Sequence, residues 1–326
     1  MDELDTLAKA LENLAATSAG FERVIRTVEF DWSDGAPSVG RFVYPGFVHG
    51  APNIDALVDF LDRSLVQYCI PRSEVNDLCD PAKLGSTPEE LQAFGESYNA
   101  MKDRARKAFI RARKELKSGG EAGEVLLFIL LERLLKAPLL VAKMNLKTNN
   151  NQPNFGRDGV HVTYDEGSQS LVLLLGESKL EQTFSKAVDH AIESVKGYLD
   201  DLELREHEIN VIRSHHDLGA MPVKAQEQLR KLLNPYGGGP PDAGQVHACL
   251  IGFEATQYAQ VAKMAPAEIE EAFRNAYLKR IETGCALIKN KIEDALPPGT
   301  RIIFFLMPFP SLEVLRKTFM QKLGVN

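Results

Sequence analysis

Two acidic residues and a lysine, Asp158, Glu177 and Lys179, have the types and the spacing for metal-assisted hydrolysis. Residues 158–179 (DGVHVTYDEGSQSLVLLLGESK) have the alternation and the central turn signal of a β-hairpin. Because strand side chains alternate between faces, Glu177 and Lys179 share one face. If the turn centres between residues 166 and 167, Asp158 pairs with Leu175 and joins that face. Two carboxylates and an ammonium would then form a seat for a divalent metal and an attacking water.

The register of this hairpin decides whether the three side chains converge. A turn of three residues would place Asp158 on the opposite face. The pattern of an acid followed by ExK is also weak by itself, because Glu115 and Lys117 repeat its second half inside a predicted helix. The hairpin match therefore depends on the elements around it.

A buried helix is predicted before the hairpin, because residues 121–131 are apolar almost all round. Glu124 lies in its first turn. A carboxylate there is favoured by the helix dipole, which is one explanation for it. The other is that a carboxylate in so apolar a helix needs a cation, which a metal site would supply.

Periodicity and turn signals predict the remaining elements. The predicted helices span residues 2–16, 54–68 (capped by Asn53), 87–117, 182–202, 266–294 and 311–323. The predicted strands span residues 24–30, 39–48, 139–147, 246–254 and 302–307, with a short strand and turn over 211–217.

The order from residue 120 onward is helix, strand, strand, strand, helix, strand, followed by a further helix, strand and helix. This order predicts an α/β fold with an antiparallel hairpin inside the sheet. It resembles the restriction-endonuclease-like core of the PD-(D/E)xK nucleases. We assign residues 101–326 to this domain, with the last helix, strand and helix as a C-terminal extension. Residues 1–100 form an acidic N-terminal α+β region, for which we expect a role in partner docking or restraint.

Composition narrows the class of protein. The 326 residues favour one large domain or two. The N-terminus lacks the basic start and apolar core of a secretory signal, and no apolar run is long enough to span a bilayer. The four cysteines have no metal-ligand spacing. We therefore expect a cytoplasmic protein with reduced thiols and no membrane contact.

Charge is distributed unevenly along the chain. The formal net charge is -7, and residues 1–100 contain 17 acidic and 7 basic side chains. Residues 102–117 (KDRARKAFIRARKELK) carry eight basic and two acidic side chains. This stretch is either one solvated helix face or a surface that contacts phosphates, and we expect the lone chain to bind DNA weakly and with strong salt dependence.

Four short segments show a closer resemblance. Residues 123–127 (GEVLL), 143–149 (KMNLKTN), 156–161 (GRDGVH) and 176–179 (GESK) are similar to the HamA family, the nuclease subunits of Hachiman anti-phage defence systems. The similarity is densest over residues 123–195. The proline that often precedes the motif aspartate in PD-(D/E)xK nucleases is replaced by arginine here.

The resemblance implies a Mg²⁺-dependent (or Mn²⁺-dependent) DNA endonuclease whose partner is a superfamily-2 helicase subunit. Asp158 and Glu177 would bind the metal, Glu124 would be the supporting acid, and Lys179 would orient the attacking water or stabilise charge on the phosphate. Candidates for phosphate contact are Lys143, Lys147 and Lys186, although a solubilising role at a strand edge is equally open for the first two.

Two other functions remain open at the level of sequence. A non-catalytic adaptor with a nuclease fold would bind DNA and recruit the helicase, although such degenerate sites usually lose one of the three motif residues. A ribonuclease of the same fold would use the same metal and water chemistry.

Overall fold

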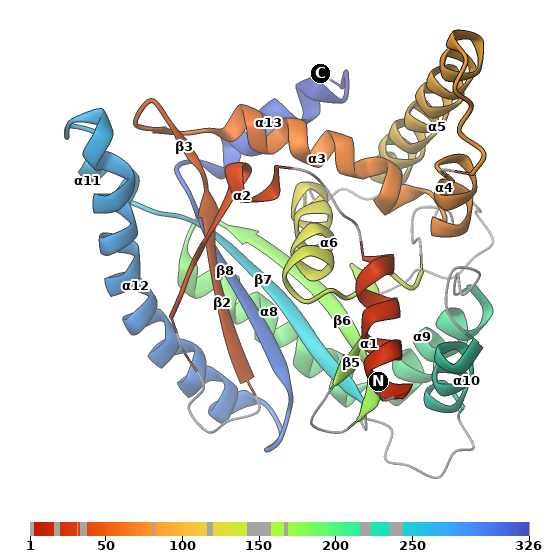
Figure 1. Ribbon diagram of the computed structural model, residues 1–326. Helices are drawn as coiled ribbons and strands as arrows, with labels where there is room; N and C mark the ends of the chain where they lie inside the picture. The colour runs from red at the N-terminus through yellow and green to blue at the C-terminus, as the bar shows by residue number, and fades with distance from the viewer. Residues whose placement is uncertain are drawn as a thin grey trace.

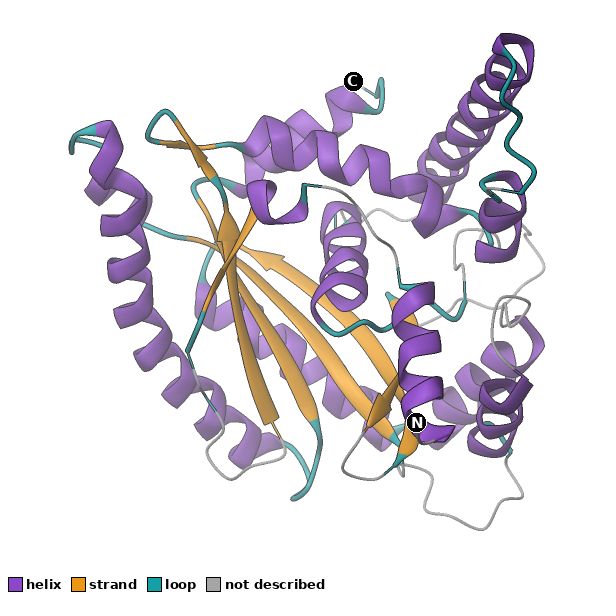
Figure 2. Cartoon of the chain, viewed as in Figure 1, coloured by secondary structure: helices purple, strands orange, loops and turns teal. Residues whose placement is uncertain are grey.

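A central sheet of six strands organises the molecule (Figures 1 and 2). The computed structural model describes residues 3–15, 20–30, 32, 38–80, 82–115, 120–141, 158–165, 169–215, 223–234 and 244–325. The strands lie in the order β1 (Ile25–Val28), β2 (Ser38–Pro45), β8 (Ile302–Phe309), β7 (Gln245–Glu254), β6 (Ser170–Glu181) and β5 (Gly159–Asp165). The inner four are parallel, and β1 and β5 are antiparallel to their neighbours. The α/β class is therefore confirmed.

Most of the predicted elements are present. The predicted helices correspond to α1 (Glu3–Leu14), α3 (Ile54–Cys69), α5 (Pro88–Glu115), α6 (Glu121–Leu134), α8 (Phe184–Asp200), α12 (Pro266–Ala295) and α13 (Leu312–Lys322). The Asn53 side chain accepts a hydrogen bond from Ala56 N at 3.0 Å and so caps α3 as expected. Smaller elements are α2 (Phe21–Val24), α4 (Arg72–Leu78), α10 (Val223–Leu232), α11 (Gln257–Val261) and the ribbon of β3 (Phe47–Val48) and β4 (Ala51–Pro52).

Two predictions about strands need correction. In the described part of the predicted strand 139–147, Leu139 forms only an isolated bridge to His161, and residues 142–147 lie outside the described chain. The strand and turn predicted over 211–217 is wrong as far as residue 215, because α9 (Leu202–His215) occupies that stretch. Arg205 and Glu208 are buried on α9 together with Ile212. Polar residues at buried helical positions concealed its period.

Helices cover both faces of the sheet (Figure 1). One core packs α3, α6 and α13 against the sheet, and another packs α8 and α12 against the opposite face. A third core joins β5 and β6 to α1, α9 and α10. Along β6, Leu174 and Leu180 lie in the core with α6, whereas Leu173 and Leu175 lie in the third core. Even-numbered residues of β6 therefore face α6, and odd-numbered residues face away from it.

The first hundred residues are built into the same sheet. They supply β1 and β2, and β2 pairs with β8 near the end of the chain. They also supply α3, which packs in one core with α6. The central sheet therefore crosses the boundary that the sequence placed at residue 100.

The basic segment 102–117 is partly engaged by acids of the N-terminal region. Arg106 binds the Asp62 carboxylate through two nitrogens, at 2.8 and 2.6 Å, and Lys102 Nζ lies 3.5 Å from the same carboxylate. Arg104 pairs with Glu74 on α4 at 2.5 Å. Three of the basic side chains on α5 therefore anchor the helix to α3 and α4, which narrows the surface that could contact phosphates.

We expect Arg106→Ala to lower the free energy of unfolding by about 3 kcal/mol, because it leaves the buried Asp62 carboxylate without its bidentate partner. The exposed Arg111 on the same helix provides the control, and Arg111→Ala should cost less than about 0.5 kcal/mol. Urea unfolding monitored by circular dichroism measures both values. Equal losses in the two variants would show that the Asp62–Arg106 pair does not anchor α5.

Candidate active site

The candidate site lies where β6 extends beyond the end of its neighbour β5, the edge strand of the sheet. The β5–β6 ladder runs from Asp165 opposite Ser170 to Gly159 opposite Gly176. Beyond that pair β6 continues for residues 177–181, which remain paired with β7 on the other side. Within the described residues no strand pairs with residues 177–181 on this side, and Arg316 on α13 donates to Leu180 O at 2.7 Å.

The predicted partner of Asp158 was wrong by two residues. Val160, and not Asp158, lies opposite Leu175. The reason is a longer connection, because the last pair before the turn is Asp165 with Ser170. Since strand side chains alternate with a period of two, a shift of two residues leaves the two strands in the predicted phase.

Asp158 closes the open edge with its own side chain. Its backbone N–H donates to Gly176 O at 3.0 Å. Its Oδ2 atom accepts hydrogen bonds from Ser178 N at 2.6 Å and from Ser178 Oγ at 2.7 Å. The carboxylate therefore takes the place of the next strand residue, through charge-assisted bonds that are stronger than neutral ones.

Ser178 in turn is held against the start of α6. A Cβ atom on Gly123 would lie 3.1 Å from Ser178 Oγ and 3.1 Å from Leu180 Cγ. A side chain at position 123 would therefore force the helix and the strand apart. Glycine permits the first turn of α6, which carries Glu124, to lie directly on β6.

Glu177 and Lys179 form the second part of the site. Lys179 Nζ lies 2.6 Å from Glu177 Oε1, and the Glu177 residue is only 7% exposed. Burial acts to lower the pKa of Lys179, but the adjoining Glu177 carboxylate and then Asp158 raise it above its ordinary value. The ammonium is therefore charged at neutral pH, and Asp158 is near enough to influence it.

Glu124 is joined to the N-terminal region through Tyr68 on α3. The Tyr68 hydroxyl donates to Glu124 Oε2 at 2.9 Å, and both residues are buried. Burial, then Glu124, then Asp158 raise the pKa of the Tyr68 phenol well above 10. The phenol is therefore always protonated at physiological pH, and the Glu124 and Asp158 carboxylates both act on it.

The predicted metal ligands do not form a closed cluster. In the described part of the chain, no group of three or more His, Cys, Asp and Glu side chains is arranged to hold a metal ion. Magnesium, however, is often held by one or two carboxylates together with water and substrate phosphates. Asp158 and Glu177 could supply those two. Both of these carboxylates act on the Lys179 ammonium, so a divalent cation would offset the negative charge that the ammonium leaves unbalanced.

Of the three lysines predicted to contact DNA, one lies within the described residues. Lys186 is exposed in the first turn of α8, directly after β6. Lys143 and Lys147 lie outside the described residues. The structure therefore leaves Lys186 as the described candidate for a phosphate contact beside the site.

Sequence reasoning missed three residues of this site. Ser178 is the variable residue inside the ExK motif, and its type gave no sign of the bond to Asp158. Gly123 was a possible signal, because glycine inside a buried helix indicates a close approach. Tyr68 gave no local signal, because it meets Glu124 only through the packing of α3 on α6.

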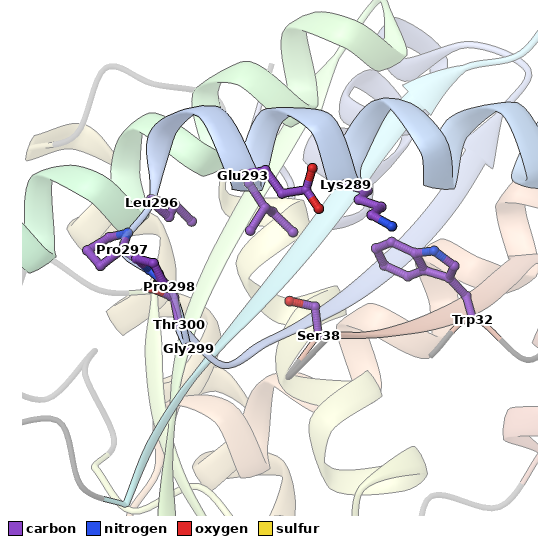
Figure 3. Close-up of a pocket in the computed structure, with 10 residues that line it drawn as sticks. Trp32, Ser38, Lys289, Glu293, Leu296, Pro297, Pro298, Gly299 and Thr300 are labelled. Atoms are coloured by element: carbon purple, nitrogen blue, oxygen red, sulfur yellow. Dashed lines mark hydrogen bonds between the residues drawn. The ribbon is translucent and has the colours of Figure 1, made fainter. Parts of the chain in front are cut away.

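The described chain also has a small apolar cavity, three strands away from the acidic site (Figure 3). It measures about 230 Å³ and lies between Trp32, Ser38, the end of α12 and residues 297–300. Ser38 is on β2, and β8 and β7 separate it from β6. The cavity is therefore not part of the site around Glu177.

Comparison with known protein families gives one match. The model of the family described as HamA matches residues 22–323, which is most of the chain. No curated protein matches the sequence. The family match confirms the resemblance indicated by the four short sequence segments.

We expect Ser178→Ala to destabilise the protein by about 1–2 kcal/mol, because it removes the hydroxyl bond to Asp158 and leaves the backbone bond in place. The exposed Ser185, which donates to Asp189 at 3.4 Å, is the matched control and should cost under about 0.5 kcal/mol when changed to alanine. Chemical denaturation measures both. A loss for Ser178→Ala no larger than for Ser185→Ala would contradict the role of Ser178 as an anchor.

Proposed function

The chain belongs to the HamA family and is therefore a component of the Hachiman anti-phage defence system, and from this premise we propose that it is a metal-dependent DNA endonuclease. The observation that carries the proposal is the contact of 2.6 Å between Lys179 and Glu177 on the open end of β6. Asp158 acts electrostatically on the same ammonium. An acid pair that can bind a metal ion, with a lysine beside it, supplies the side chains that metal-dependent phosphodiester hydrolysis uses.

We propose further that the core is of the PD-(D/E)xK type. The chain order α6, β5, β6, α8, β7 supports this assignment, with α6 and α8 on opposite faces of the sheet. In the described residues, a single bridge at Leu139 stands where that order calls for a first strand.

In this proposal Asp158 and Glu177 hold Mg²⁺, and Glu124 supports them. The metal supplies charge neutralisation and an activated water. The chain's own contribution is to fix Lys179. Its ammonium is held by Glu177 and stays protonated, so it can orient the water or stabilise the charge that grows on the phosphate oxygens. Lys186, exposed beside the strand end, would contact a neighbouring phosphate.

A non-catalytic DNA-binding adaptor is the second candidate, and one observation favours it. The two hydrogen bonds from Ser178 to Asp158 are those of a carboxylate that serves to close a strand edge. In that case the chain would need no metal, and metal binding and cleavage assays separate the two functions.

We also propose that a helicase subunit of the same system docks on the projecting end of α5 (Figure 1). No residue from 88 to 100 is buried, and Leu91 is 52% exposed. Phe94 and Tyr98 lie on the same stretch, with ring centroids 6.1 Å apart. An apolar helix surface beside the acids of α4 fits a partner with an apolar contact and a basic rim.

We expect Glu177→Gln or Lys179→Ala to lower the rate of plasmid cleavage with Mg²⁺ by on the order of 10²-fold or more, because each removes a preorganised charge from the reacting phosphate. The control is Lys322→Ala, since Lys322 Nζ also lies 2.6 Å from a carboxylate oxygen, that of Asp59. The assay is run with and without the helicase, with EDTA, and with RNA as a second substrate. Wild-type activity in either variant would contradict the assignment of Glu177 and Lys179 to the active site. A preference for RNA would show that the enzyme is a ribonuclease.

We expect Leu91→Asp to weaken retention of the helicase in a pull-down by about tenfold or more, because a leucine side chain buried at an interface contributes about 1.5–3 kcal/mol. The control is Val314→Asp on α13, where Val314 is 49% exposed. The first 85 residues cannot be deleted for this test, since they supply two strands of the sheet. Undiminished retention of Leu91→Asp would place the docking surface elsewhere.

A further inference from the structure

We infer that Tyr68 is a positioning residue for the candidate metal site, and that it orients Glu124 toward a divalent cation. The inference rests on the proposed function and extends it to a side chain from the N-terminal region. Tyr68 lies near the end of α3, 56 residues before its hydrogen-bond partner Glu124. The first hundred residues would therefore help to build the site, in addition to any role in docking.

The position of the phenol is fixed by its surroundings. Tyr68 is 1% exposed, and its ring packs against Phe128 and Phe109 at centroid distances of 5.4 and 6.4 Å. A ring enclosed in this way has little freedom to turn. Its hydroxyl is therefore held at Glu124 Oε2.

Two of the three candidate acids, Glu124 and Asp158, act on this phenol. Glu124 accepts its hydrogen bond, and the charge of Asp158 also acts on the hydroxyl. Asp158 is itself fixed by Ser178, which rests against Gly123, the neighbour of Glu124. Tyr68 thus holds Glu124 on the α6 side of the contact between α6 and β6, and Ser178 holds Asp158 on the β6 side.

Loss of the phenol hydroxyl should loosen Glu124 without opening a large cavity. A buried carboxylate that loses a donor seeks another partner or shifts its side chain. A carboxylate that is no longer held in place is a weaker ligand, because ordering it on binding costs free energy. The expected consequence is weaker cation binding, separate from any change in folding.

The test measures Mn²⁺ binding to the full-length chain by isothermal titration calorimetry, with thermal unfolding recorded for each variant. We expect Tyr68→Phe to weaken Mn²⁺ affinity at least fivefold. The matched control is Tyr277→Phe, because the Tyr277 hydroxyl is also buried and donates a hydrogen bond, to Leu306 O at 2.7 Å in the other core. This control should lower the unfolding temperature to a similar degree and leave Mn²⁺ affinity unchanged.

A second variant, Glu124→Gln, completes a double-mutant cycle with Tyr68→Phe. If the phenol acts through Glu124, the double variant should bind Mn²⁺ no more weakly than Glu124→Gln alone. Additive losses would overturn the inference, as would equal affinity of Tyr68→Phe and the wild type, or equal losses in the two tyrosine variants. If Tyr68→Phe does not fold, an unchanged affinity in Glu124→Gln overturns it, and a fivefold loss supports it. A wild-type chain that binds no Mn²⁺ overturns the proposed metal-dependent function as well.

Discussion

The structure around the site depends on the point at which β5 ends and β6 continues without it. A backbone N–H at such a place, here partly buried, needs a partner, because a donor that is shielded from water and unpaired is costly. Ser178 N finds that partner in the Asp158 carboxylate, 2.6 Å away. The same requirement that completes the sheet therefore places an acid beside the strand end that carries Glu177 and Lys179. Closing the sheet edge and assembling the charged groups are one arrangement here.

The buried helix α6 imposes the second constraint. All its residues from 121 to 132 are buried, so it needs apolar partners on every side. It meets β6 on one side, through the close approach at Gly123, and α3 on another. Because α3 belongs to the first hundred residues, that region completes the environment of Glu124. Asp62 on α3, paired with Arg106, also anchors α5, so the basic helix and the candidate site rest on one N-terminal helix.

The extent to which sequence predicted this arrangement follows from the range of each interaction. Asp158, Glu177 and Lys179 were identifiable because a hairpin is local and side-chain alternation fixes their phase even when the register is wrong by two. Tyr68 was not identifiable, because its partner is 56 residues away and the two meet only through helix packing. The same applies to Asp62 and Arg106, since composition shows a basic segment but not which of its charges are paired. In α9, the buried Arg205 and Glu208 broke the apolar period on which the prediction of a helix relies.

The structural use of Asp158 is compatible with metal binding. Both hydrogen bonds from Ser178 end on Oδ2, whereas an ionised carboxylate has about four acceptor sites on its two oxygens. Oδ1 takes part in neither bond, so a cation could bind there while the sheet edge stays closed. Holding one oxygen also reduces the freedom that the side chain would lose on binding a metal. A carboxylate fixed by the fold is thus a better ligand than a mobile one, and the residue that closes the sheet is well placed to bind the cation.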